Sequence, residues 1–213
     1  MTGKNLTWRF LVWGLAVLIP ALNPVHADSI AKLRSFYADV NTFSADFDQV
    51  VLDENLNRIE ERSGQMWLAR PGKFRWDYEP PLEERVVSDG EKVWVYDIEL
   101  EQITVRSLDR SLGRTPALLL AGKGNLDTTY NLEDRGEHGK VFWVALVPKS
   151  NDGNFSEIQL GFEGHELRLM QLLDQLGQIT RIVFKDNETN PELTPTLFDF
   201  VPPPGVDVLD DSE

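Results

Sequence analysis

The chain has 213 residues with no cysteine, and its 35 acidic and 21 basic residues give a formal net charge of -14. So acidic a chain repels the phosphates of nucleic acids, and no nucleic-acid partner is expected. The lack of cysteine excludes disulfide bonds and a lipid-modified cysteine, and the length fits one domain with a substantial core.

Residues 1–27 have the pattern of a cleavable secretory signal peptide. Lys4 and Arg9 provide the positive start, and the apolar run from Leu11 to Ile19 is too short to span a bilayer. Cleavage before Asp28 removes those two positive charges, which takes the net charge from -14 to -16. The sequence therefore predicts an exported protein.

The mature chain opens with a predicted helix and a predicted hairpin. From Ser29 to Val40, apolar residues recur every three or four positions, which is typical of an amphipathic helix. From Phe43 to Val51 the pattern changes to strict alternation, which predicts a strand. A polar turn from Asp53 to Arg58 and a return strand from Ser63 to Ala69 follow.

Aromatic residues are concentrated between Gly64 and Tyr96, in short alternating runs separated by turn residues. Phe74, Trp76 and Tyr78 fall on one face of a predicted strand, while the polar residues between them fall on the other. With Arg70 at its entrance, this aromatic surface suggests an apolar binding concavity. Alternation alone leaves open which face is concave; the predicted lining residues are Phe47, Trp67, Trp76 and Trp94.

A short helix is predicted after Thr115, which can cap it, with Pro116 at its first position and Gly122 just beyond its end. Between them, Leu118, Leu119 and Leu120 make this helix apolar on every side. Such a helix must be covered, and the aromatic face of the sheet is its expected partner.

The remaining pattern is mostly β. Turn signals such as Asp89-Gly90 separate further strands. These are predicted at Gln102–Leu108, Thr129–Glu133, Val141–Val147, Glu157–Phe162, Leu167–Leu173 and Ile179–Phe184. A succession of roughly ten short strands predicts a mainly β fold built on one large curved antiparallel sheet. The domain is expected to span residues 28–206, followed by a disordered acidic tail, 207–213.

The sequence offers no catalytic constellation. His138 and His165 lie in Gly- and Glu-rich segments that predict solvated turns, and no His or Cys cluster has metal-ligand spacing. Nucleophile-elbow, phosphate-loop and dinucleotide motifs are also absent from the sequence. We therefore expect a protein that is not an enzyme and needs no metal or cofactor.

The run from Trp67 to Trp76, WLARPGKFRW, resembles the periplasmic outer-membrane lipoprotein carrier family, LolA. The likeness continues through Val87–Gly90, Val93–Tyr96, Glu101-Gln102, Thr115–Ala117 and Phe198–Pro203. The resemblance implies an incomplete antiparallel barrel whose apolar cavity is covered by helices. It also implies a monomeric carrier that collects acylated lipoproteins from an inner-membrane ATP-driven transporter and delivers them to an outer-membrane receptor.

Two residue roles follow from the resemblance alone. Arg70 matches the family arginine that hydrogen-bonds the lid and holds the empty cavity closed. Phe74 matches the aromatic residue implicated in one-way transfer of cargo to the receptor. The lid itself would be the short helix that contains Pro116, Leu118, Leu119 and Leu120.

Other classes of protein remain as alternatives. A related outer-membrane receptor and a periplasmic sensor domain would share the half-barrel. The absence of a lipidation cysteine argues against the receptor, and the absence of a second membrane segment argues against an anchored sensor. A secreted hydrolase is disfavoured because no catalytic residues support it.

Overall fold

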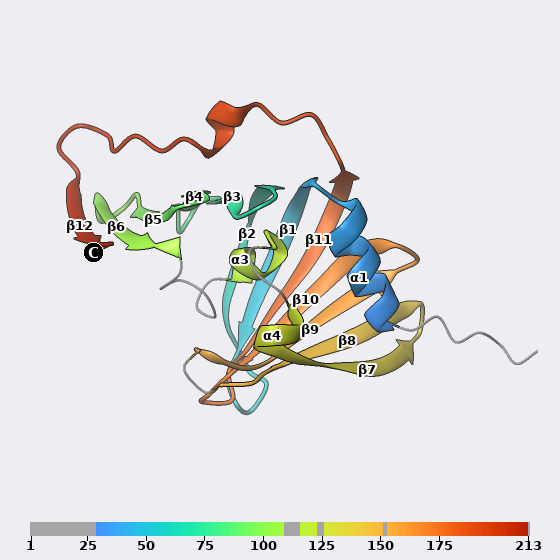
Figure 1. Cartoon of the computed structure of the whole chain (residues 1–213). Coiled ribbons are helices and arrows are strands. Elements are labelled where there is room, and N and C mark those ends of the chain that lie inside the picture. Colours follow the sequence, from blue (N-terminus) through green and yellow to red (C-terminus); the bar gives the residue numbers. More distant parts are fainter. Residues whose placement is uncertain (1–28, 109–115, 123–125, 151–152, 213) are drawn as a thin grey trace, which may run out of the picture.

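The computed structural model describes residues 29–108, 116–122, 126–150 and 153–212 (Figure 1). The predicted signal peptide and the predicted cap Thr115 lie outside these residues. The helices are α1 (Ser29–Asp39), α3 (Pro116–Leu120), α4 (Leu126–Thr129) and the 3-10 helix η1 (Pro195–Phe198). The strands are β1 (Thr42–Leu52), β2 (Arg58–Ala69), β3 (Lys73–Tyr78), β4 (Glu84–Asp89), β5 (Lys92–Asp97), β6 (Gln102–Ser107), β7 (Tyr130–His138), β8 (Val141–Pro148), β9 (Phe155–Glu163), β10 (Glu166–Asp174), β11 (Ile179–Thr189) and β12 (Asp207–Asp211).

All twelve described strands belong to a single sheet, in the order β12-β6-β5-β4-β3-β2-β1-β11-β10-β9-β8-β7. Neighbouring strands are antiparallel except β12, which runs parallel to β6. The prediction of a mainly β fold with one curved sheet is confirmed. One detail differs, because β7 continues through His138, which pairs with Val141 of β8 instead of lying in a turn.

One face of the sheet, here called the inner face, packs against helices. On β1 the buried residues are Phe43, Ala45, Phe47 and Val51, all at odd-numbered positions, as alternation requires. Leu33 and Phe36 of α1 join them in one core. Figure 1 shows α1 and α3 lying on the same side of the sheet.

The predicted apolar helix is confirmed as α3, and it is covered as expected. Residues 117–121 are all buried, and they belong to the same core as the inner face. A short helix with no polar side packs stably only in this way, because every exposed face would leave leucine in water.

The opposite, outer face carries two of the tryptophans that were expected to line the interior. Val93 and Val95 belong to the inner core, so alternation turns Trp94, which lies between them, outward. Met66 and Leu68 place Trp67 on the outer face in the same way. The prediction that Trp67 and Trp94 border the cavity is therefore wrong.

Trp94 is covered by the segment that follows η1. The ring of Phe200 stacks on it with centroids 6.0 Å apart, and the same ring meets Tyr96 edge to face at 6.1 Å. Tyr96, Ile103 and Val105 form a second, smaller core here. The C-terminal segment thus closes the outer side of β5 and β6.

We expect Phe200→Ala to lower the free energy of unfolding by about 1–2 kcal/mol, because it removes aromatic stacking as well as apolar burial. The emission of Trp94 should shift to longer wavelength as the ring becomes hydrated. Denaturant titrations followed by tryptophan fluorescence measure both effects. Unchanged stability and emission would show that Phe200 does not cover Trp94 in solution.

The expected disorder of residues 207–213 is wrong for Asp207–Asp211, which form β12. Backbone pairing with β6 explains the difference, because without β12 the edge of β6 would present unpaired N–H and C=O groups. The N–H of Asp207 also donates to the carbonyl of Glu101 at 3.0 Å. The sheet therefore extends beyond residue 206.

Candidate functional site

Arg70 joins the ends of two helices. It follows the last residue of β2, and its Nε and Nη2 donate to the carbonyl of Leu120 in α3 at 3.2 and 2.9 Å. Its Nη1 donates to the carbonyl of Phe36 at 3.0 Å and to that of Val40. Helix C-termini carry unpaired carbonyls and partial negative charge, so a fixed cation suits this position.

Aromatic rings flank the guanidinium of Arg70. Its Cζ lies 4.7 Å from the ring centroids of both Phe36 and Tyr37, a cation–π geometry. The hydroxyl of Tyr37 donates to the carbonyl of Leu119, the neighbour of Leu120 in α3. Burial raises the pKa of Tyr37, an effect that the charge of Arg70 partly offsets. Burial also lowers the pKa of Arg70, yet a guanidinium stays charged in proteins.

Gly122 allows α3 to approach Arg70. Its φ of +64° is in the region that favours glycine, and a Cβ there would meet Nε of Arg70 at 2.9 Å. The N–H of Gly72 donates to the carbonyl of Ala121 at 3.1 Å. The carbonyls of Leu119, Leu120 and Ala121, at and just after the end of α3, therefore accept hydrogen bonds from Tyr37, Arg70 and Gly72 respectively.

The hydrogen bonds from Arg70 to α3 agree with the contact that the resemblance implies. The acceptors of Arg70 are one carbonyl of α3 and two from the end of α1. The contacts with α1 were missed because main-chain acceptors carry no residue signature.

The inner face is strongly aromatic beneath these helices. Phe74 and Phe47 are almost fully buried, and Trp76 is 3% exposed. The ring of Trp76 lies 4.9 Å from Phe47 and 6.3 Å from Phe184, centroid to centroid. Sequence reasoning named Phe47, Phe74 and Trp76 but missed Phe184, which the alternation of β11 could have indicated.

Beside Trp76 the inner face becomes polar. Cζ of Arg62 lies 3.8 Å from the ring centroid of Tyr78, whose hydroxyl is 3.1 Å from Oε1 of Gln49. Arg62 also lies 3.8 Å from the carboxylate of Glu84, and burial raises the pKa of that carboxyl group. Arg62 and Arg70 are eight positions apart along the chain, which corresponds to about 26 Å of strand. The interior thus has an arginine towards each end.

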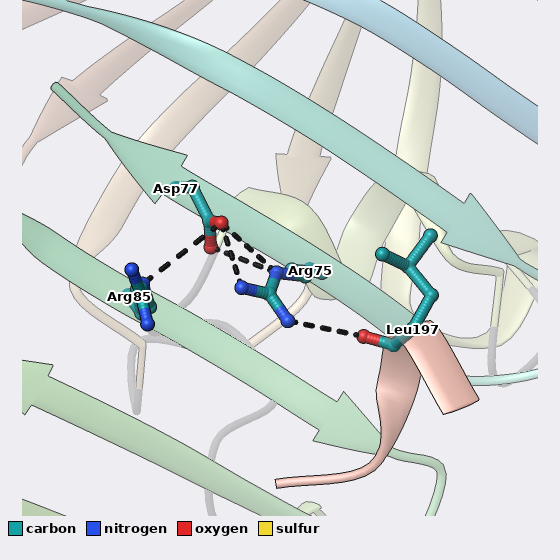
Figure 2. A network of polar contacts seen from close by, with 4 residues as sticks. All are labelled: Arg75, Asp77, Arg85 and Leu197. Carbon is teal, nitrogen blue, oxygen red and sulfur yellow. Dashed lines mark hydrogen bonds and ion pairs between the residues drawn. The ribbon is translucent and has the colours of Figure 1, made fainter.

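The outer face of β3 is ionic, as predicted. Figure 2 shows Arg75 bound to the carboxylate of Asp77, with Nε at 2.9 and 3.0 Å from its two oxygens. Nε of Arg85 lies 4.0 Å from the same carboxylate. Nη1 of Arg75 reaches the carbonyl of Leu197 at 3.5 Å, which ties η1 to the outer face. Phe74, Trp76 and Tyr78 accordingly share the inner side.

Two absences apply to the described residues only. They contain no group of three or more His, Asp or Glu side chains placed to hold a metal ion. None of their helices has the length and apolar character needed to cross a membrane.

Comparison with known proteins places these features in a family. Residues 38–201 match the family model described as "Outer membrane lipoprotein carrier protein LolA". The "Outer-membrane lipoprotein carrier protein" of Methylococcus capsulatus is 44% identical over 201 residues, which cover 94% of both chains. The protein of the same name from Nitrosospira multiformis is 45% identical over 207 residues, covering 96% of this chain and 99% of that one.

A solved structure has a similar fold. The crystal structure of an uncharacterized conserved protein from Thermus thermophilus aligns with 85% of this chain and 96% of its own, with a TM-score of 0.55. At 12% sequence identity, this similarity concerns the fold alone.

Proposed function

Because the chain belongs to the LolA family of outer-membrane lipoprotein carriers, we propose that it is a chaperone that binds the acyl chains of lipoproteins and shuttles them to the outer membrane. The observation that carries the proposal is the apolar, aromatic inner face closed by α1 and α3, with Arg70 bonded to both helices. The role is one of binding and transfer, without catalysis.

The physical demand on such a carrier is burial of hydrocarbon. Moving each acyl methylene out of water lowers the free energy by about 0.8 kcal/mol, so a lipoprotein does not diffuse freely between membranes. The inner face offers matching apolar surface once α3 moves away from it. Release must then proceed without ATP, which favours a carrier whose empty state is itself stabilised.

Arg70 supplies that stabilisation in our proposal. Its hydrogen bonds hold α3, the lid helix with Pro116, Leu118, Leu119 and Leu120, against α1. Cargo must break these bonds to enter, and their re-formation favours release. Phe74, buried beneath the lid helix, is the proposed contact in transfer to the receptor.

The partners and compartment follow from the same proposal. An inner-membrane ATP-driven transporter would supply the lipoprotein, and an outer-membrane receptor would accept it. The carrier works in the periplasm as a monomer, after removal of residues 1–27.

Native mass spectrometry of the protein recovered from the periplasm, with its transporter present, tests the proposal. We expect a mature chain beginning at Asp28 that carries acylated lipoprotein in a one-to-one complex. Retention of residues 1–27, an added diacylglycerol, or only unliganded protein would contradict it.

A further inference from the structure

We propose that the indole N–H of Trp76 donates a hydrogen bond to an ester carbonyl of the bound acyl chains. This inference rests on the proposed carrier function and assigns one residue of the interior to a specific atom of the cargo. It makes Trp76 a determinant of which lipids the protein prefers.

The first observation is an orphaned donor. Nε1 of Trp76 is buried and has no hydrogen-bond partner among the described residues, and the indole ring contacts three aromatic rings. A buried indole N–H is usually paired, because it gives up its bond to water on folding. An unpaired donor in a closed apolar interior is therefore a cost that a ligand acceptor can relieve.

The second observation is the position of Trp76 at a chemical boundary. Its ring contacts Phe47 and Phe184, which belong to the buried apolar core. It also contacts Tyr78, the next residue on the same face of β3, and Arg62 lies over the ring of Tyr78. Nε of Arg62 is a second buried donor without a hydrogen-bond partner among the described residues.

An ester group occupies the same kind of boundary in an acylated lipid. It joins the hydrocarbon chain to the polar glycerol, and its carbonyl is an acceptor without a donor. With the chains among the phenylalanines, the ester would meet Trp76 and the glycerol would face Arg62. Trp76 pairs with Met66, four residues before Arg70, so this contact lies about 13 Å along the strand from the hydrogen bonds that hold the lid helix.

The test compares two synthetic lipopeptides that differ only in their linkage. One carries two palmitoyl esters on an S-glyceryl cysteine, and the other carries hexadecyl ethers, whose oxygens are weak acceptors. The wild-type protein should bind the ester form about fivefold more tightly. Trp76→Phe keeps an aromatic ring but removes the donor, so it should bind both forms equally.

Trp94→Phe is the matched control, because Trp94 lies on the outer face and this variant should keep the preference for the ester. A direct measurement needs no variant: the indole N–H resonance of Trp76 should move downfield with the ester and not with the ether. Equal binding of both lipopeptides by the wild type, or an unmoved resonance, would overturn the inference while leaving the carrier function intact. If neither lipopeptide bound, the carrier function itself would fail.

Discussion

Arg70→Leu should leave the sheet folded and stop delivery, so that lipoprotein accumulates on the carrier. Hydrogen bonds to a charged donor contribute about 1.5–3 kcal/mol each, and in our proposal those from Arg70 to Leu120 form only in the closed, empty state. Losing about 2 kcal/mol of that stabilisation would raise the affinity for cargo roughly 30-fold. The transfer rate of a labelled lipoprotein from carrier to receptor-bearing vesicles measures the effect.

The control for this variant is Arg75→Leu. Arg75 is also a half-buried arginine that donates to a main-chain carbonyl, but it lies on the outer face (Figure 2). The Arg75→Leu variant should deliver cargo at the wild-type rate. Arg70→Lys should fall between wild type and Arg70→Leu, because an ammonium cannot span carbonyls from two helices as the guanidinium fork does. Wild-type delivery by Arg70→Leu would show that Arg70 does not hold the lid helix.

Gly64→Ala should produce a large loss of stability. A Cβ on Gly64 would lie 2.0 Å from the carbonyl oxygen of Asp77 and 2.9 Å from Cζ of Phe47. The carbonyl belongs to the paired backbone of β3, so β2 and β3 would have to separate locally. We expect a loss of about 3 kcal/mol or more. A melting temperature roughly 6–12 °C below wild type would follow.

Gly161→Ala is the graded comparison. Its Cβ would meet the side chains of Val141 and Leu169 at 2.9 and 3.1 Å, and no backbone atom is among its closest neighbours. Cγ1 of Val141 can move by rotation of its side chain, and the contact with Cβ of Leu169 is less severe than the one with the carbonyl of Asp77, so the expected loss is about 1–2 kcal/mol. Equal losses of stability in thermal melts of the two variants would show that the close approach of Gly64 to the carbonyl of Asp77 does not matter more than side-chain crowding.

Alternation predicted the local structure well. Phe74, Trp76 and Tyr78 share a face because residues two apart on a strand must, whatever the rest of the chain does. The turn after β4 was equally readable, since Gly90 has a φ of +99° and the carboxylate of Asp89 accepts the N–H of Glu91.

Contacts between residues far apart in the chain could not be predicted from the sequence. Whether Trp94 faces inward depends on Phe200, more than a hundred residues later, which covers the opposite face of β5. The pairing of β12 with β6 uses main-chain groups that every sequence carries, so the acidic composition of residues 207–211 was misleading. Arg70 was predicted as a contact of α3 only through family resemblance, because its acceptors are carbonyls.

The pairing of β1 with β11 has a consequence for how the chain is made. Gln49 lies opposite Ile182, so the centre of the sheet joins segments from near the two ends of the chain. If the chain crosses a membrane with its N-terminus first, strands β1 to β6 can pair with one another early. The pairing of β1 with β11 can form only after β11 has crossed. Until then, the apolar inner face of β1 to β3 is exposed to water, and the nascent chain needs protection from aggregation.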